Sequence, residues 1–261
     1  MEAKELKLLC IGNSFSEDTT AHLPRIALLA GFSRVKIVNL YVGGCSIRKH
    51  CFHAEEDLPA YRCDVNEGEG WSHTPNVKIS DAIRSEKWDW ISVQHGTGDK
   101  SRYTEWSSYE KLPWLIGYIK SLAPETSKIA FNMTWVGEPD HPHEEIRYYG
   151  GDQLRIYERI AKLTEERILP MAGIDAVAPT GTAIQNARSA GFGLLTRDGY
   201  HLSLDAGRYI AGMTFFKALT GADCSGVPWI NGESDPAKAI AEKAVNAALA
   251  EPFRVTGRRE G

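Results

Sequence analysis

The sequence predicts an α/β protein in which a central parallel sheet of about five strands lies between two layers of helices. Short apolar runs rich in β-branched residues alternate along the chain with longer segments whose apolar residues recur at helical spacing. Parallel strands need long crossover connections, and such helices supply them. With 43% hydrophobic and 25% charged residues and no internal repeat, the 261 residues fit one globular domain, residues 1–261.

The expected elements follow one another in this alternating order. The strands are predicted at residues 6–11, 35–42, 88–93, 128–133 and 174–178. The helices are predicted at residues 19–30, 80–85, 106–122, 151–169, 183–188, 204–219 and 236–249. Two long insertions, at about 43–80 and 134–150, are expected to be irregular. Connections of that length are unusual unless they carry function.

The first expected strand ends in Gly12-Asn13-Ser14-Phe15, directly before a predicted helix. A serine at such a turn is exposed at the edge of a sheet, where free backbone N–H groups can bind a developing oxyanion. The simpler interpretation of Ser14 is a helix N-cap, which is common where a strand turns into a helix.

A second polar motif, Asp198-Gly-Tyr-His201, precedes the helix predicted at 204–219. A histidine that deprotonates a serine needs a carboxylate to orient its ring and stabilise its cation. Asp198 and His201, three residues apart, supply both groups. Taken alone the motif is weak, because both side chains could simply cap the following helix.

The two motifs in this order resemble those of the SGNH/GDSL hydrolase superfamily, whose first motif is Gly-Asp-Ser-Leu and whose last is Asp-x-x-His. The resemblance covers about residues 6–220 and implies a flavodoxin-like α/β/α fold. It assigns Ser14 as nucleophile, His201 as general base and Asp198 as its carboxylate partner. Asn13 and Phe15 depart from the usual first motif, so the resemblance is to a divergent, esterase-like member.

The resemblance also points to an oxyanion hole. Gly44 best matches the glycine of the second family motif, and its N–H is expected to act together with the N–H of Ser14. Gly98 stands where the third motif has asparagine, so that side-chain donor is missing. Gln94, at the end of the strand predicted at 88–93, is the nearest amide that could replace it.

An independent argument brings these residues together. In parallel α/β sheets, ligands bind beyond the carboxyl ends of the strands. Ser14, Gly44, Gln94 and Trp135 all follow expected strand ends, and they should therefore share one cleft. The predicted function is hydrolysis of a small acyl ester, with acetyl preferred, by a Ser-His-Asp mechanism.

The alcohol part of the substrate is predicted to be a carbohydrate. The superfamily includes many carbohydrate O-acetylesterases, and aromatic side chains in the two insertions suit the faces of sugars: Phe52, Tyr61, Trp71, Trp135, Tyr148 and Tyr149. An equally good interpretation is that these aromatics pack the insertions onto the core. His95 and Trp135 are the named substrate-contact residues, and a catalytically silent carbohydrate-binding module is the alternative function.

Composition argues against several other classes. The net charge of −4 does not favour nucleic acid, and neither a membrane span nor a phosphate-binding loop is evident. Five irregularly spaced cysteines exclude a complete disulfide framework and match no usual zinc pattern, so one disulfide or free thiols are expected, with no metal or organic cofactor.

The charged start lacks a signal-peptide pattern, which predicts a cytoplasmic protein, or a secreted or periplasmic one if a signal peptide has been removed. The oligomeric state is not predicted.

Overall fold

The computed structural model describes residues 4–96, 102–232 and 235–256, and its centre is a seven-stranded sheet with strand order β4-β3-β2-β1-β5-β6-β7. The strands are β1 (Glu5–Gly12), β2 (Arg34–Tyr41), β3 (Tyr61–Asn66), β4 (Trp71–Val77), β5 (Trp90–Gln94), β6 (Lys128–Asn132) and β7 (Ala176–Ala178). The five predicted strands form the parallel part, in which β1 pairs with both β2 and β5. The predicted fold class is therefore confirmed, with two strands more than expected.

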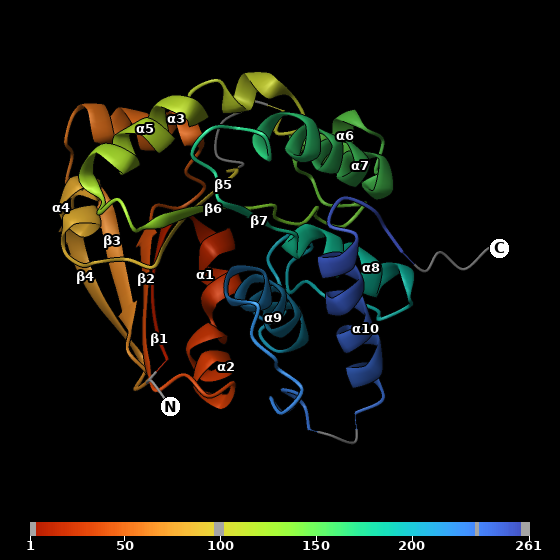
Figure 1. The fold of residues 1–261 in the computed structure, drawn as a ribbon. Coiled ribbons are helices and arrows are strands. Elements are labelled where there is room, and N and C mark those ends of the chain that lie inside the picture. The colour runs from red at the N-terminus through yellow and green to blue at the C-terminus, as the bar shows by residue number, and fades with distance from the viewer. Residues whose placement is uncertain (1–3, 97–101, 233–234, 257–261) are drawn as a thin grey trace.

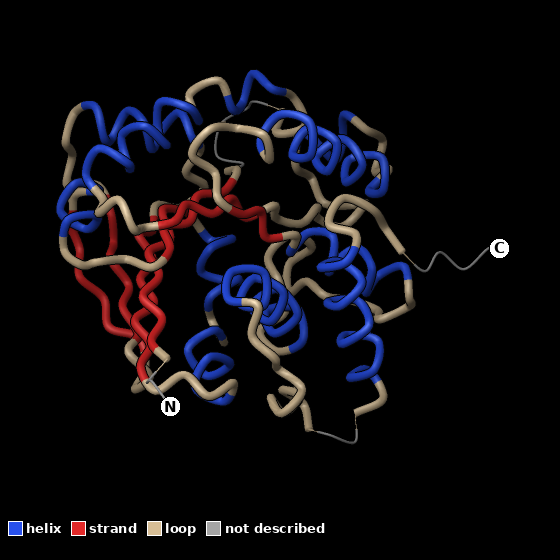
Figure 2. Tube along the Cα trace, in the orientation of Figure 1, coloured by secondary structure: helices blue, strands red, loops and turns tan. Residues whose placement is uncertain are grey.

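Helices cover both faces of this sheet (Figures 1 and 2). One layer contains α1 (Ser14–Thr20), α2 (Leu23–Leu29), α8 (Thr180–Ser189), α9 (Ala206–Thr220) and α10 (Ala237–Ala250). The other contains α3 (Ile47–Glu55), α4 (Ile79–Arg84), α5 (Leu112–Leu122), α6 (Glu144–Tyr148) and α7 (Gln153–Leu163). A 3₁₀ turn, η1 (Trp106–Tyr109), precedes α5, and a π-helical turn, η2 (Thr164–Ile168), extends α7.

The prediction that residues 43–80 are irregular is wrong. This insertion contains α3 and the hairpin β3–β4, in which β3 pairs antiparallel with β2, whereas α4 corresponds to the helix predicted at 80–85. In β3 the apolar residues Tyr61, Cys63 and Val65 alternate with polar ones, but the run is only six residues long. Five consecutive residues of β4 are exposed and include Pro75, so no apolar alternation marks this strand. Residues 134–150 include the short helix α6 but are otherwise irregular, as expected.

The first helix begins earlier than its apolar spacing indicates. It begins at Ser14 and is interrupted after Thr20, and α2 follows from Leu23 with Pro24 in its first turn. The polar residues of α1 concealed this start, although most of them are buried against the sheet and α9.

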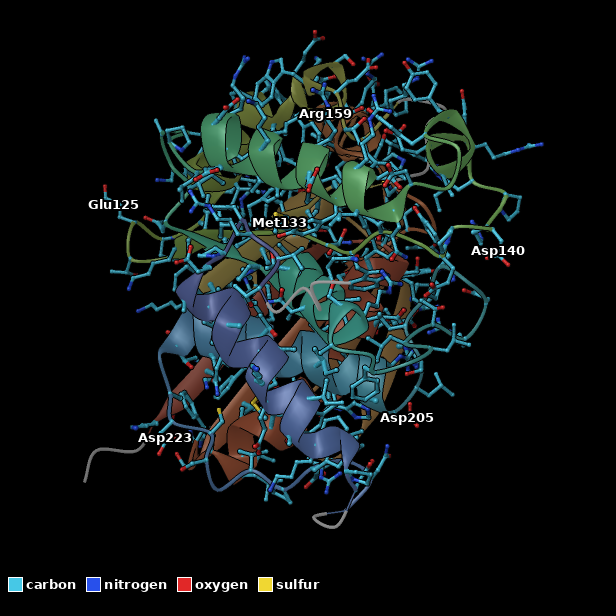
Figure 3. The ribbon with its side chains drawn as sticks, turned by 90° about the vertical axis from the view of Figure 1, so that its right-hand side faces the viewer. Glu125, Met133, Asp140, Arg159, Asp205 and Asp223 are labelled. Carbon is cyan, nitrogen blue, oxygen red and sulfur yellow. The ribbon has the colours of Figure 1, made fainter. Side chains whose placement is uncertain are left out.

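The core consists of two apolar clusters, one on each side of the sheet. Successive residues of β1 point to opposite faces: Leu8 and Cys10 belong to the cluster beneath α1 and α9, whereas Leu9 and Ile11 belong to the cluster beneath α3 and α5. Figure 3 shows Met133, directly after β6, between the helical layers. Among the described helices, none is both long and apolar enough to cross a bilayer.

Replacement of Leu9 by alanine tests the importance of this core. The Leu9 side chain is completely buried in the central strand, so its truncation leaves a cavity and should lower the free energy of unfolding by about 2–5 kcal/mol. Urea unfolding followed by circular dichroism measures this loss. Leu194→Ala is the matched control, because Leu194 is 71% exposed and should change stability by less than about 0.5 kcal/mol. Equal stabilities of the two variants would contradict this description of the core.

Candidate active site

Ser14 is the first residue of α1, directly beyond the end of the central strand β1. The helix is capped by Asn13 and not by Ser14: the Asn13 Oδ1 atom accepts a hydrogen bond from the Phe15 N–H at 2.9 Å. The Ser14 hydroxyl therefore remains available for another partner.

That partner is His201. Its Nε2 atom lies 2.9 Å from Ser14 Oγ, and its Nδ1 atom lies 2.6 Å from Asp198 Oδ2. The other carboxylate oxygen, Asp198 Oδ1, accepts the backbone N–H groups of Tyr200 and His201. Asp198 and His201 do not cap the following helix, because α9 is capped by Asp205. The structure thus joins Asp198, His201 and Ser14 in one hydrogen-bonded chain.

The surroundings of Asp198 favour its charged form. Partial burial acts to raise its pKa, but the hydrogen bonds from the His201 ring and from the two backbone N–H groups outweigh this effect and lower the pKa to about 2. The carboxylate is therefore ionised at any pH above that range, and it can stabilise a positive charge on His201.

The Asn13 side chain connects three segments around Ser14. Its Nδ2 atom donates to the Cys45 carbonyl at 3.0 Å, and its Oδ1 atom also accepts Gln94 Nε2 at 2.8 Å. Gly44, directly before Cys45, has a φ of 58°, a left-handed conformation that favours glycine. Asn13 thus holds the loop that carries the Gly44 N–H beside the Ser14 turn, while the Gln94 amide supports Asn13.

Asp18 holds the segment that carries His201. This carboxylate, one turn after Ser14 on α1, is completely buried. Its Oδ2 atom accepts the Leu202 N–H at 2.8 Å, and its Oδ1 atom accepts Arg197 Nη1 at 2.9 Å and Arg208 Nε at 2.8 Å.

A second contact comes from the insertion at 134–150. Glu138 forms an ion pair with Arg188 at 2.7 Å and accepts the Thr196 hydroxyl at 3.0 Å. Its own N–H donates to the Gly199 carbonyl at 2.6 Å. The turn containing Asp198 and His201 is therefore held from both sides.

The two residues predicted to contact substrate are buried. His95 is 2% exposed and hydrogen-bonded through Nε2 to Thr134, and Trp135 is 1% exposed with its Nε1 donating to the Tyr200 carbonyl. Both side chains therefore belong to the packing of the core as the structure has them. Gln94 is likewise buried, and Gly98 lies outside the described residues.

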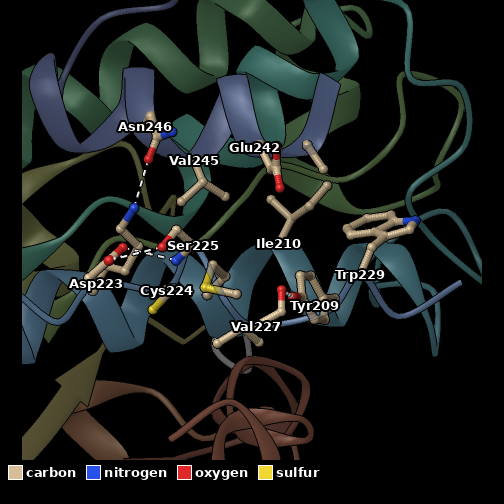
Figure 4. A pocket seen from close by; sticks show the side chains of 13 residues that line it. Tyr209, Ile210, Asp223, Cys224, Ser225, Val227, Trp229, Glu242, Val245 and Asn246 are labelled. Atoms are coloured by element: carbon tan, nitrogen blue, oxygen red, sulfur yellow. Dashed lines mark hydrogen bonds between the residues drawn. The ribbon is translucent and has the colours of Figure 1, made fainter. Parts of the chain in front are cut away.

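The sequence left the state of the cysteines open, and the structure has all five as free thiols. Among the described residues, no group of three or more His, Cys, Asp or Glu side chains is placed to hold a metal ion. A cavity of about 330 Å³ lies between α9 and α10, lined among others by Tyr209, Cys224 and Trp229 (Figure 4). Neither Ser14 nor His201 lines it.

Comparison with known proteins places this chain in a family. The family model described as "Domain of unknown function (DUF4886)" matches residues 7–249. The chain belongs to this family. A crystal structure of a DUF4886 family protein from Bacteroides uniformis is 33% identical, with a TM-score of 0.89 over 97% of this chain and 98% of that chain. Comparison with curated proteins finds no match.

More distant solved structures share the fold. A catalytic mutant of an acetylxylan esterase from Geobacillus stearothermophilus is 16% identical, with a TM-score of 0.50 over 86% of this DUF4886 protein and 98% of that chain. LAE5, an α/β hydrolase enzyme from the metagenome of Lake Arreo, is 17% identical, with a TM-score of 0.50 over 83% and 96% of the two chains.

Replacement of Asp18 by alanine should be strongly destabilising. It leaves Arg197 and Arg208 without their shared carboxylate and the Leu202 N–H without its acceptor, so we expect a loss of about 3–5 kcal/mol in the free energy of unfolding. Urea unfolding measures it. Glu17→Ala is the control, because this neighbouring carboxylate is partly exposed and should contribute about 1 kcal/mol or less. Similar losses for both variants would contradict the role of Asp18.

His95 should make the protein sensitive to acid. Burial lowers the pKa of His95 from 6.5 to about 3, so the folded protein keeps the ring neutral while the unfolded chain protonates it. Its stabilising contribution is complete above pH 6.5 and is lost as the pH falls toward 3. Between pH 7 and 5 the loss from this residue should be about 2 kcal/mol.

Urea unfolding at several pH values tests the His95 prediction. The variant His95→Gln should lose about 2 kcal/mol less stability than the wild type between pH 7 and 5. The comparison uses the change in the free energy of unfolding with pH, so a pH-independent change in stability caused by the substitution does not affect the result. Identical slopes for both proteins would show that His95 is not buried as a neutral ring.

Proposed function

We propose that this protein is a serine esterase of the SGNH type that hydrolyses a small acyl ester, with acetyl preferred, on a carbohydrate. The observation that carries the proposal is the chain of hydrogen bonds from Asp198 through His201 to Ser14. A serine hydroxyl is a weak nucleophile unless a base takes its proton, and this arrangement supplies the base and the carboxylate that orients it.

In the proposed reaction, Ser14 Oγ attacks the ester carbonyl carbon while its proton moves to His201 Nε2. The Nδ1–H group of the resulting imidazolium donates to Asp198. When the tetrahedral intermediate collapses, the bond to the alcohol oxygen breaks, and His201 gives the proton to the leaving alcohol. Water then attacks the acyl group on Ser14 by the same route and releases the carboxylic acid.

The negative oxygen of the intermediate is proposed to bind the backbone N–H groups of Ser14 and Gly44. A single such donor is typically worth about 3 kcal/mol of the barrier. Gln94 was predicted as a third donor; its amide donates to Asn13, so we propose that it acts by holding Asn13, which in turn holds the Gly44 loop.

The carbohydrate part of the proposal draws on two observations. One distant structural neighbour is named as an acetylxylan esterase. In addition, the first insertion contributes Trp71, which is partly exposed on the hairpin beside α1 and offers a flat apolar surface. The alternative, a catalytically silent carbohydrate-binding module, would bind sugars but turn over no ester.

Hydrolysis of p-nitrophenyl acetate separates the two functions. We expect the wild type to release p-nitrophenol, and Ser14→Ala and His201→Ala each to lower kcat/KM on the order of 10³-fold or more, because both act as one unit. The exposed substitution Ser72→Ala is the control and should keep wild-type rates. Turnover by well-folded wild type that is no greater than that of Ser14→Ala would refute the esterase and favour the binding module.

A further inference from the structure

A separate cavity lies beside the helix that begins at Ser14. Between residues 14 and 21, three residues are partly exposed, namely Ser14, Glu17 and Ala21, and the others are buried. Their spacing of three and four places them on one side of the helix, with Ala21 about 10 Å along the axis from Ser14. Glu17 and Ala21 both line a cavity of about 170 Å³, which therefore lies on the side of α1 that also carries the nucleophile.

The opposite wall of this cavity is a polar row across three strands. Asn39 of β2 pairs with Asp64 of β3, and Asp64 pairs with His73 of β4, so the three side chains lie side by side on one face. All three line the cavity. Asn39 Nδ2 donates to Thr20 of α1, which establishes that this face is turned toward the helix.

The charges around the cavity are already compensated. Asp64 accepts two hydrogen bonds from Arg62, at 2.6 and 2.7 Å, and lies 2.6 Å from His73 Nδ1. Arg62 also contacts Glu17 at 3.1 Å, and Arg208 is paired with Asp18. A lining of balanced charges gives neither a cation nor an anion a net attraction, and it suits a neutral ligand with many hydroxyl groups.

Two further features fit such a ligand. The indole of Trp71 lines the cavity and supplies an apolar face, and the His73 side chain is 54% exposed, with Nδ1 held by Asp64 and Nε2 on the other side of the ring. Asn39 is 1% exposed, and its Oδ1 atom has no hydrogen-bond partner in the described part of the chain. An aromatic platform beside fixed polar groups is the usual composition of a small-molecule site.

We infer that this cavity, between α1 and the β3–β4 hairpin, is the subsite for the alcohol part of the ester and holds one neutral sugar ring. Trp71 stacks on the ring, and Glu17 and His73 bind its hydroxyl groups. The inference rests on the proposed function for its connection to catalysis. In this proposal, the β3–β4 hairpin at the edge of the parallel sheet contributes to substrate selection.

Kinetics with two kinds of ester tests the subsite. The probes are p-nitrophenyl acetate, which has no sugar, and the per-O-acetylated forms of xylose, glucose, galactose and cellobiose. For Trp71→Ala and His73→Ala, the ratio of kcat/KM for the preferred acetylated sugar to that for p-nitrophenyl acetate should fall about tenfold, mainly through KM. Ser72→Ala, an exposed residue between the two on β4, should leave the ratio unchanged.

An unchanged ratio in both variants would overturn the subsite, as would equal losses on every ester with a lowered melting temperature, which indicates a structural role. A binding experiment keeps this conclusion separate from the proposed function. In the ¹H–¹⁵N spectrum of Ser14→Ala, titration with methyl β-xyloside, methyl β-glucoside or methyl β-galactoside should shift the Trp71 indole signal, which Trp71→Phe identifies.

The hydrolysis experiment and the glycoside-binding experiment test different claims, so either claim can be refuted without the other. An indole shift in a protein that hydrolyses no ester would retain the sugar site and refute the esterase. Ester hydrolysis without any shift of the Trp71 indole signal, even at the highest glycoside concentrations tested, would retain the esterase and refute the sugar site.

Discussion

The buried carboxylate of Asp18 connects the two parts of the chain on which the candidate active site depends. Ser14 and His201 are 187 residues apart, and their hydrogen bond requires the start of α1 and the loop before α9 to keep a fixed separation. Asp18 achieves this because it lies on α1 and accepts the N–H of Leu202, the residue directly after His201. Two arginines neutralise its charge, without which a completely buried carboxylate would be very unfavourable.

Asn13 fixes the position of the Gly44 loop beside Ser14, as Asp18 fixes the segment that carries His201. One amide side chain caps α1, receives the Gln94 amide and donates to the Cys45 carbonyl. Asparagine suits this position because it offers a donor and an acceptor together, whereas an ionised aspartate, the residue of the usual motif, could only accept. The departure at Asn13 from the SGNH/GDSL motif that the sequence resembles is therefore linked to how this chain holds its Gly44 loop.

The sequence predicted those features that local patterns or motif order encode. Apolar periodicity identified the five parallel strands, and the order of the motifs selected Ser14, Asp198 and His201, which the structure brings together. The hairpin β3–β4 escaped prediction because the apolar alternation of β3 is only six residues long and because β4 is mostly exposed and polar and contains Pro75. Asp18 escaped because the helix was predicted to begin at residue 19, which left Asp18 in the preceding turn, whereas α1 begins at Ser14.

His95 and Trp135 show the limit of reasoning from strand ends. Both follow strands whose carboxyl ends lie near the site, but both side chains are buried, because tertiary packing decides which way a side chain points. Trp71, by contrast, was one of several aromatics named without a location. The strand register places it beside a row of polar groups that no linear pattern links to Ser14.

The most direct test of the central claim, that Ser14 is an activated nucleophile, is labelling with a fluorophosphonate, read by intact mass and peptide mapping. The account predicts one adduct on Ser14 in the wild type, none in Ser14→Ala and a severe loss in His201→Ala. A well-folded wild-type protein that takes up no adduct, or takes it up equally well without His201, would contradict it.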